Sequence, residues 1–240
     1  MLDHINPDEV IFLDIETVPQ YPDFYQLNEQ FRYLWDKKSA NFRKPEETAS
    51  DVYQRAGIYA EFGKIICIST GYLYLVNTEQ HLRLKSFYSD NEKELLLDFA
   101  AMLNIFSKKK NVLLCAHNGK EFDFPYIARR MLVNGVPLPR ALDIAGRKPW
   151  ETCFLDTLEL WKFGDYKNYT SLELLTAIFG IPTPKDDING SMVAGVYWND
   201  NDLRRIVTYC EKDVIAIAQL FLKYKGDSLM PAENCHSVTE

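Results

Sequence analysis

The sequence predicts a mixed α/β fold in which a five-stranded sheet carries helices on both faces. Two continuous apolar runs, at 10–13 and 112–116, are typical of strands that are buried on both faces. Between them, alternating and β-branched segments predict a hairpin. Segments with helical periodicity follow the later strands, and strands and helices in this order form a sheet with helices packed on it.

The five strands can be placed in chain order. We expect a first strand at 10–13, a hairpin formed by 64–76 and 81–88, a fourth strand at 112–116 and a short fifth strand at 152–155. The first three strands can form a meander. The last two can add in parallel through helical crossovers.

Helices are expected after the hairpin and after each later strand. Residues 89–92 cap a helix whose apolar positions, from Leu95 to Phe106, recur at helical spacing. A second helix is predicted at 121–134 and is closed by Gly135. Later helices are predicted after a capping box at 156–159, at 171–179 and at 200–225.

A single domain over residues 1–240 is expected, because this length can bury one substantial core and no repeat or low-complexity linker divides it. It carries a helical and loop insertion at about 19–62. A substrate-side lid and plain surface padding are both open interpretations of this insertion. The last residues, at about 227–240, are expected to be frayed.

Composition limits the class of protein. A hydrophobic fraction of 47% with 25% charged residues excludes a disordered or fibrous chain. No apolar run approaches the roughly 18 residues that span a bilayer, so no membrane partner is expected. A net charge of −7 argues against a broad basic surface that coats nucleic acid, but not against a nucleic-acid enzyme. The five widely spaced cysteines favour a reduced, cytoplasmic location.

The first strand ends in two acidic residues, Asp14 and Glu16. Side chains alternate along a strand, so both carboxylates emerge on the same face. Adjacent carboxylates at the end of a buried strand repel each other and lose hydration, which is costly without a nearby cation. Mg²⁺ and Mn²⁺ prefer oxygen ligands, so these two residues predict a metal site.

Two later segments can bring further groups to this site. Asp123 falls in the first turn of a helix that follows a buried strand, and that strand can end beside the first one. Tyr209 and Asp213 are four residues apart on a helix, so they share a face. Taken singly, Asp123 could be an acid at a helix N-terminus, and Tyr209 with Asp213 an ordinary helix face.

Several other polar residues are given structural roles. His117 is expected to be a strand-end structural residue and Asp156 a helix cap, rather than metal ligands. Two roles stay open for Arg129–Arg130 and Arg204–Arg205: they can contact phosphates, or they can be solvated residues on helix faces.

Three ordered segments resemble the exonuclease motifs of the DEDD (DnaQ-like) superfamily: Asp14-x-Glu16, Asn118-x₃-Phe122-Asp123 and Tyr209-x₃-Asp213. The tyrosine of the third segment is typical of the DEDDy branch. The whole chain resembles the proofreading 3′–5′ exonuclease domain of B-family DNA polymerases, and in particular the stand-alone exonucleases related to it. No polymerase palm or fingers fit within 240 residues, so a built-in proofreading role is not implied.

This resemblance implies an RNase H-like fold and a two-metal hydrolysis of the terminal phosphodiester of single-stranded DNA, with release of nucleoside monophosphates. Two Mg²⁺ or Mn²⁺ ions would be held by Asp14, Glu16, Asp123 and Asp213. Tyr209 would orient the attacking water. Contacts to the terminal nucleotide would come from Ile15, Thr17, Asn118 and Phe122.

Two other functions stay open. RNA could be the substrate, because the motifs do not read the sugar. A catalytically silent nucleic-acid-binding module could also have this fold, although intact carboxylates at all four positions argue against it.

Overall fold

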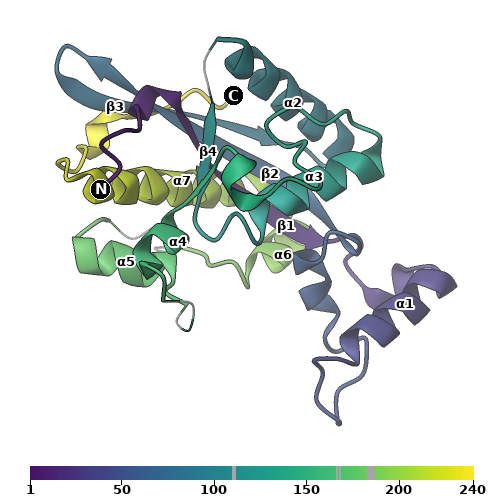
Figure 1. The fold of residues 1–240 in the computed structure, drawn as a ribbon. Coiled ribbons are helices and arrows are strands. Elements are labelled where there is room, and N and C mark those ends of the chain that lie inside the picture. Colours follow the sequence, from purple (N-terminus) through teal and green to yellow (C-terminus); the bar gives the residue numbers. More distant parts are fainter. Residues whose placement is uncertain (110–111, 166, 168, 183–186) are drawn as a thin grey trace.

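The computed structural model describes residues 1–109, 112–165, 167, 169–182 and 187–240. Its strands form one mixed sheet with the order β5-β4-β1-β2-β3-β6 (Figure 1). These strands are β1 (Val10–Pro19), β2 (Gly63–Val76), β3 (Glu79–Tyr88), β4 (Leu113–Ala116), β5 (Phe154–Asp156) and β6 (Cys235–Ser237).

The connectivity of the first five strands is the predicted one. β1, β2 and β3 form an antiparallel meander, and β4 and β5 add in parallel beside β1. The sixth strand was not predicted. β6 pairs in parallel with β3 and lies in the tail that was expected to be frayed.

Long-range hydrogen bonds hold this tail in place. The side-chain amide of Asn234 donates to the Gln80 carbonyl at 3.0 Å, and the Val238 N–H donates to the Leu84 carbonyl at 2.9 Å. These bonds are to β3, which is about 150 residues earlier in the chain. The tail is therefore part of the sheet, and the prediction of fraying over 235–237 is wrong.

Helices cover both faces of the sheet, as predicted (Figure 1). α2 and α3 pack on one face, and α5 and α7 pack on the other. None of the described helices is both long enough and apolar enough to cross a bilayer. The α-helices are α1 (Glu29–Ser39), α2 (Glu92–Lys109), α3 (Asp123–Asn134), α4 (Thr157–Lys162), α5 (Leu172–Phe179), α6 (Val193–Gly195) and α7 (Leu203–Lys225). Shorter turns are the 3₁₀ segments η1 (Pro7–Glu9), η2 (Phe24–Gln26), η3 (Tyr53–Ile58), η4 (Pro149–Glu151) and η6 (Ala232–Asn234), with a π-helix η5 (Val196–Asp200) before α7.

The alternation of β1 divides the core into two layers. Ile11, Leu13 and Ile15 pack under α2 and α3, whereas Val10 and Phe12 pack under α7. Since β1 is the third of six strands, it is buried on both faces, which explains its continuous apolar run.

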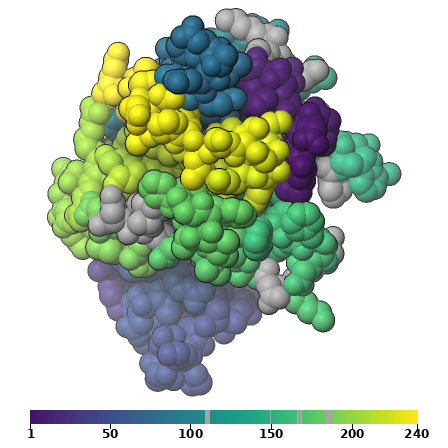
Figure 2. Space-filling model, turned by 90° about the vertical axis from the view of Figure 1, so that its left-hand side faces the viewer, coloured from purple at the N-terminus to yellow at the C-terminus, as the bar shows by residue number. Residues whose placement is uncertain are grey.

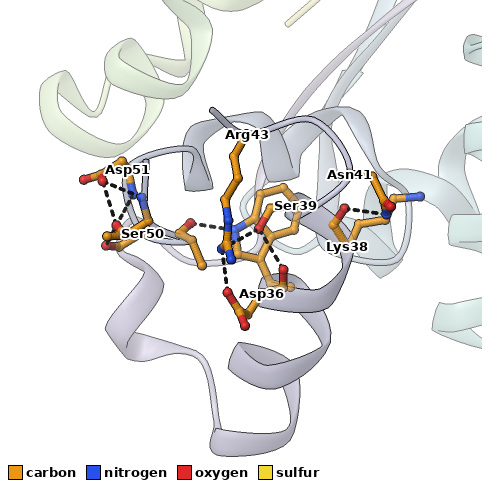
Figure 3. A network of polar contacts seen from close by, with 10 residues as sticks. Asp36, Lys38, Ser39, Asn41, Arg43, Ser50 and Asp51 are labelled. Atoms are coloured by element: carbon orange, nitrogen blue, oxygen red, sulfur yellow. Dashed lines mark hydrogen bonds and ion pairs between the residues drawn. The ribbon is translucent and has the colours of Figure 1, made fainter. Parts of the chain in front are cut away.

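The segment at 19–62 packs around its own small core beside the end of β1. The ring of Trp35 is fully buried, and its indole N–H donates to the Ala49 carbonyl at 2.8 Å. Arg43 hydrogen-bonds the side chains of Asp36 and Ser39, which ties the chain after α1 back onto that helix (Figure 3). α1, η2, η3 and the loops between them therefore form a packed unit that projects from the sheet (Figure 1).

Candidate active site

Two acidic side chains of β1 lie on the sheet face that α7 covers. Ile15 points into the core under α2 and α3, whereas Phe12 packs against α7. Because side chains alternate along a strand, Asp14 and Glu16 share the α7 face with Phe12. A carboxylate oxygen of each lies within 4.8 Å of the other and of the Cys210 sulfur on α7. The structure thus brings the first two predicted residues together.

A β-bulge in β2 lies directly opposite Glu16. Glu16 pairs with Cys67, and the next residue of β1 pairs with Ile65, so Ile66 is an extra residue on β2. Both Ile66 and Cys67 pack against residues of α7 instead of alternating between the two faces. Bulges bend a strand and are frequent beside active sites. Here the bulge brings β2 and α7 together next to Glu16.

Asp123, the first residue of α3, reaches β1 through its side chain. Its Oδ1 atom accepts a 3.2 Å hydrogen bond from the backbone N–H of Ile15. That N–H lies between Asp14 and Glu16 along the strand, so the third predicted carboxyl lies beside the first two. The Asp123 side chain is deeply buried, with 3% of the residue exposed.

The loop that leads into α3 is held by Asp156, the last residue of β5. The Asp156 carboxylate accepts the backbone N–H of Asn118 at 2.9 Å and that of Lys120 at 3.1 Å. It also accepts the Leu158 N–H at the start of α4, so the predicted cap is present. Asn118 adopts a left-handed φ of 62°, and a Cβ on Gly119 would lie 2.4 Å from a side chain of β4. The turn before Asp123 is therefore closely packed.

α7 supplies the remaining two predicted residues. The hydroxyl of Tyr209 lies near the Asp213 carboxyl one turn later, close enough for the Asp213 charge to raise the pKa of the phenol, and each residue is 7% exposed. The Cys210 thiol between them donates to Asp14 Oδ2 at 3.4 Å. Apolar packing such as that of Phe12 on Phe221 holds α7 against β1, and Asp213 lies close enough for its charge to act on Asp14 and Glu16.

The clustered acids hold their protons more strongly than free carboxyls. Burial raises the pKa of Asp14 and Glu16, and the negative charge of Asp213 raises both further. Burial raises the pKa of Asp123 to about 7, although two backbone hydrogen bonds lower it. Burial and the charge of Asp213 also raise the pKa of Tyr209, so this phenol keeps its proton at neutral pH.

This donor set fits a hard divalent cation. Asp14 is half-buried, and Glu16, Asp123 and Asp213 are buried. The negative charges of Asp123 and Asp213 raise the pKa of both Asp14 and Glu16, because like charges repel. A cation would remove that repulsion, and carboxylate oxygens are the ligands that Mg²⁺ and Mn²⁺ prefer.

The residues predicted to contact a nucleotide surround this cluster in different ways. Ile15 buries its side chain in the core, so only its backbone faces the acids. Thr17 lies near the Tyr126 hydroxyl, which donates to the Gly57 carbonyl at 2.7 Å, and the Phe122 ring lies 5.3 Å from the Tyr126 ring. Asn118 is half-buried in the loop before α3. The roles of these four residues stay predictions.

One residue of the site, Cys210, was not singled out by the sequence analysis. Its signal was its position three residues before Asp213, since residues three apart on a helix lie on neighbouring parts of one face. A buried cysteine is usually a small hydrophobe, which is why its polar contact with Asp14 is hard to foresee.

Other candidates are structural. The two ring nitrogens of His117 lie 2.9 Å from a threonine hydroxyl and 3.1 Å from a backbone carbonyl, as expected of a structural histidine. Arg130 is neither solvated nor free for phosphate, because it is 2% exposed and pairs with Glu92 at 2.6 and 2.9 Å. Both interpretations of Arg130 were therefore wrong. Arg205 pairs with Asp187 at the surface at 2.7 Å.

Two comparisons with known proteins identify the family and the fold. A family described as predicted 3′–5′ exonucleases related to the exonuclease domain of PolB matches residues 58–231, which include Asp123, Tyr209 and Asp213. In structure, the chain is similar to the family B DNA polymerase from the hyperthermophilic archaeon Pyrobaculum calidifontis, with a TM-score of 0.55 and 16% sequence identity over 91% of this chain. The chain spans 24% of the length of that polymerase. The fold is thus the RNase H-like α/β arrangement that the sequence predicted, with one additional strand.

Proposed function

Because the chain belongs to the family of predicted 3′–5′ exonucleases related to the exonuclease domain of PolB, we propose that it shortens single-stranded DNA from the 3′ end. It hydrolyses the terminal phosphodiester and releases one nucleoside monophosphate at each step. Nucleic acid as the substrate follows from the family; the preference for single-stranded DNA and the two-metal chemistry are the proposal.

The convergence of four acids is the observation that supports this proposal most strongly. Asp14, Glu16, Asp123 and Asp213 come from three elements and from positions up to 199 residues apart, yet Asp123 and Asp213 lie close enough to raise the pKa of both Asp14 and Glu16. Such an arrangement costs stability in the metal-free protein, because buried like charges repel. Binding of divalent cations, which in turn bind the substrate phosphate, would explain why the protein has this destabilising cluster.

The protein groups have separate roles in the proposed reaction. Asp14, Glu16, Asp123 and Asp213 would hold a pair of Mg²⁺ or Mn²⁺ ions, which would supply positive charge at the phosphate and lower the pKa of a water molecule. Tyr209 keeps its proton and orients the attacking water through its hydroxyl. The Cys210 thiol, by donating to Asp14 Oδ2, keeps that carboxyl turned toward α7.

The test is a shortening assay on oligonucleotides that carry a label at the 5′ end. With Mg²⁺ or Mn²⁺, we expect a ladder of products from DNA and no product in EDTA. An RNA oligonucleotide of the same sequence decides which sugar is accepted. A ladder from RNA alone would replace the proposed substrate, and no ladder from either would favour a catalytically silent binding module.

Asp14→Asn is the matched variant for this assay, because it keeps the shape of the side chain and removes its charge. We expect a loss of about 1,000-fold or more in rate, which corresponds to about 4 kcal/mol of the barrier. The exposed Asp143→Asn makes the same chemical change away from the site and should leave the rate unchanged. Equal activity of wild type and Asp14→Asn would assign the reaction to another site or to a contaminant.

The setting of the reaction is also part of the proposal. We propose that residues 1–240 act as one exonuclease domain in a reduced cytoplasm, which is supported by five cysteines without a disulfide in the structure. Removal of 3′-terminal nucleotides is a step of DNA repair and of proofreading. Proofreading would require a polymerase on a separate chain or in a further part of this one.

A further inference from the structure

A row of aromatic rings crosses β2, β3 and β6 on the sheet face opposite Asp14. The ring centroids of Tyr72 and Tyr74 on β2 lie 6.0 Å apart. The Tyr74 ring lies 5.5 Å from that of His81 on β3, and the His81 ring lies 5.4 Å from that of His236 on β6. We call Tyr72, Tyr74, His81 and His236 the ring row. All four residues are partly or fully exposed.

The ring row lies where α2 ceases to cover the sheet. Within α2, Phe99 packs on Phe87 of β3, and Phe106, near its C-terminal end, packs on Tyr72 at 5.4 Å. The ring row continues from Tyr72 toward the β2–β3 turn and the tail. Beside α2, a groove of about 700 Å³ extends along β3, and its lining includes Lys85 and Phe106 together with the acidic Asp98 and Glu240. Figure 2 looks onto the end of the molecule where the β2–β3 hairpin (blue) and the tail with β6 (yellow) lie side by side.

Two exposed cations accompany the ring row on β3. The Arg83 guanidinium lies 5.7 Å from the Tyr74 ring centroid, and the Lys85 ammonium lies 5.3 Å from that of Phe87. Within the described part of the chain, neither cation forms an ion pair with a carboxylate. On a chain with a net charge of −7, this makes the ring row a local site for negative charge.

We propose that the ring row, with Arg83 and Lys85, binds single-stranded nucleic acid at a site separate from the acidic cluster. Aromatic rings stack on bases of any sequence, and exposed Arg and Lys side chains bind the phosphates between them. A protein partner could use the rings, but it would not need two unpaired cations beside them. The choice of nucleic acid as the ligand rests on the proposed function. The description of the surface is independent of that function.

The surface also lies apart from the reaction site. Tyr72 pairs with Ile11, whose side chain points under α2, whereas Asp14 lies further along β1 and faces α7. A strand bound here would be held on the opposite side of the sheet from the acids. The ring row would therefore retain a long substrate between cleavage steps without contacting the terminal phosphodiester.

Binding of a 5′-fluorescein-labelled 20-mer of thymidine, measured by fluorescence anisotropy in EDTA, tests this proposal without any cleavage. Tyr74→Ala should weaken binding by about 5-fold or more, which is the effect of losing one stacked base. Arg83→Glu/Lys85→Glu should weaken it further. It should also reduce the slope of log K against log salt concentration by about 1.4, or about 0.7 for each lost phosphate contact.

The control places the same charge change on another surface. Arg147→Glu/Lys148→Glu alters two exposed cations of the loop before β5 and changes the net charge by the same amount, so it should leave the affinity within about 2-fold of wild type. Thermal unfolding of each variant shows whether it is folded. If Tyr74→Ala unfolds, the charge variant decides the question. Tyr74→Phe keeps the ring, so it should bind as tightly as wild type.

Affinity that is equal in wild type, Tyr74→Ala and Arg83→Glu/Lys85→Glu would overturn the proposal. So would a wild-type dimer in light scattering that Tyr74→Ala converts to a monomer, since the ring row would then be covered by a second copy. The shortening assay separates this result from the proposed function. If wild type shortens DNA and the variants bind it as wild type does, only the ring-row proposal is refuted. If the variants lose binding and wild type does not shorten DNA, only the proposed nuclease activity is refuted.

Discussion

Asp123→Asn should stabilise the metal-free protein at alkaline pH, although it removes a predicted metal ligand. In the folded protein burial, with the charges of Asp156 and Asp213, raises the pKa of Asp123 from 3.8 to about 7. An acid with a higher pKa in the folded state favours folding below its unfolded pKa, and this contribution is lost as the pH rises through the folded pKa. For Asp123 the loss falls between about pH 4 and pH 7.

The size of the effect follows from the same shift. A difference of about 3 pKa units corresponds to about 4 kcal/mol, because each unit is 1.36 kcal/mol. Removing the Asp123 charge also changes the titration of the neighbouring acids, so the gain is smaller, about 2–4 kcal/mol. The Asn side chain keeps the oxygen that accepts the Ile15 N–H, so this hydrogen bond is retained. For a chain of this size 1 kcal/mol shifts the Tm by about 2 °C, which predicts a Tm about 4–8 °C higher at pH 8.

Thermal unfolding followed by circular dichroism in EDTA, from pH 4 to pH 8, measures this difference. The gain of Asp123→Asn over wild type should be near zero at pH 4 and should grow up to about pH 7. Asp143→Asn, at an exposed position, should show no such pH dependence. Millimolar Mg²⁺ should raise the Tm of wild type more than that of Asp123→Asn. A variant that gains nothing at pH 8, or gains as much at pH 4, would refute the assigned repulsion.

Three further changes test other parts of the molecule. Tyr209→Phe should lower kcat in the shortening assay by about 10- to 100-fold while the Tm stays within about 2 °C, and an unchanged kcat would contradict its role in orienting water. Glu92→Gln leaves the Arg130 charge buried without its partner, so unfolding should become easier by about 3 kcal/mol and the Tm should fall by about 6 °C. Asp156→Ala releases the loop before α3, so the Mg²⁺ concentration for half-maximal activity should rise about 10-fold or more; an unaltered Mg²⁺ dependence would show that the loop needs no such support.

Local patterns were sufficient for the first five strands and for most helices. The apolar run of β1 predicted a strand at 10–13, but the strand continues to Pro19. Asp14 and Glu16 interrupt the apolar pattern while the backbone goes on pairing with β2. The hydrophobic pattern therefore does not show where a strand ends when the strand carries acidic site residues. The closing glycine of α3 was found because Gly135, with a φ of 67°, is a strong local stop signal.

Contacts between distant segments could not be predicted in the same way. β6 has three residues and no apolar alternation, and only its bonds to β3 make it a strand. Arg130 lies in a helix with an exposed arginine before it, and nothing in its neighbourhood along the chain indicates that Glu92 would pair with it. Both features depend on where elements meet in space, which periodicity within one element does not contain.

The candidate site shows the same division between local and distant information. The spacing of Tyr209 and Asp213 specifies one helix face, but not where α7 lies along β1. That position comes from the packing of α7 on β1 and β2, to which the extra residue Ile66 contributes, and it does not follow from a motif. The motifs therefore specify which acids are present, and the packing brings them close enough to repel one another. That repulsion opposes folding, and the burial of the apolar residues of β1 and α7 around the acids offsets it.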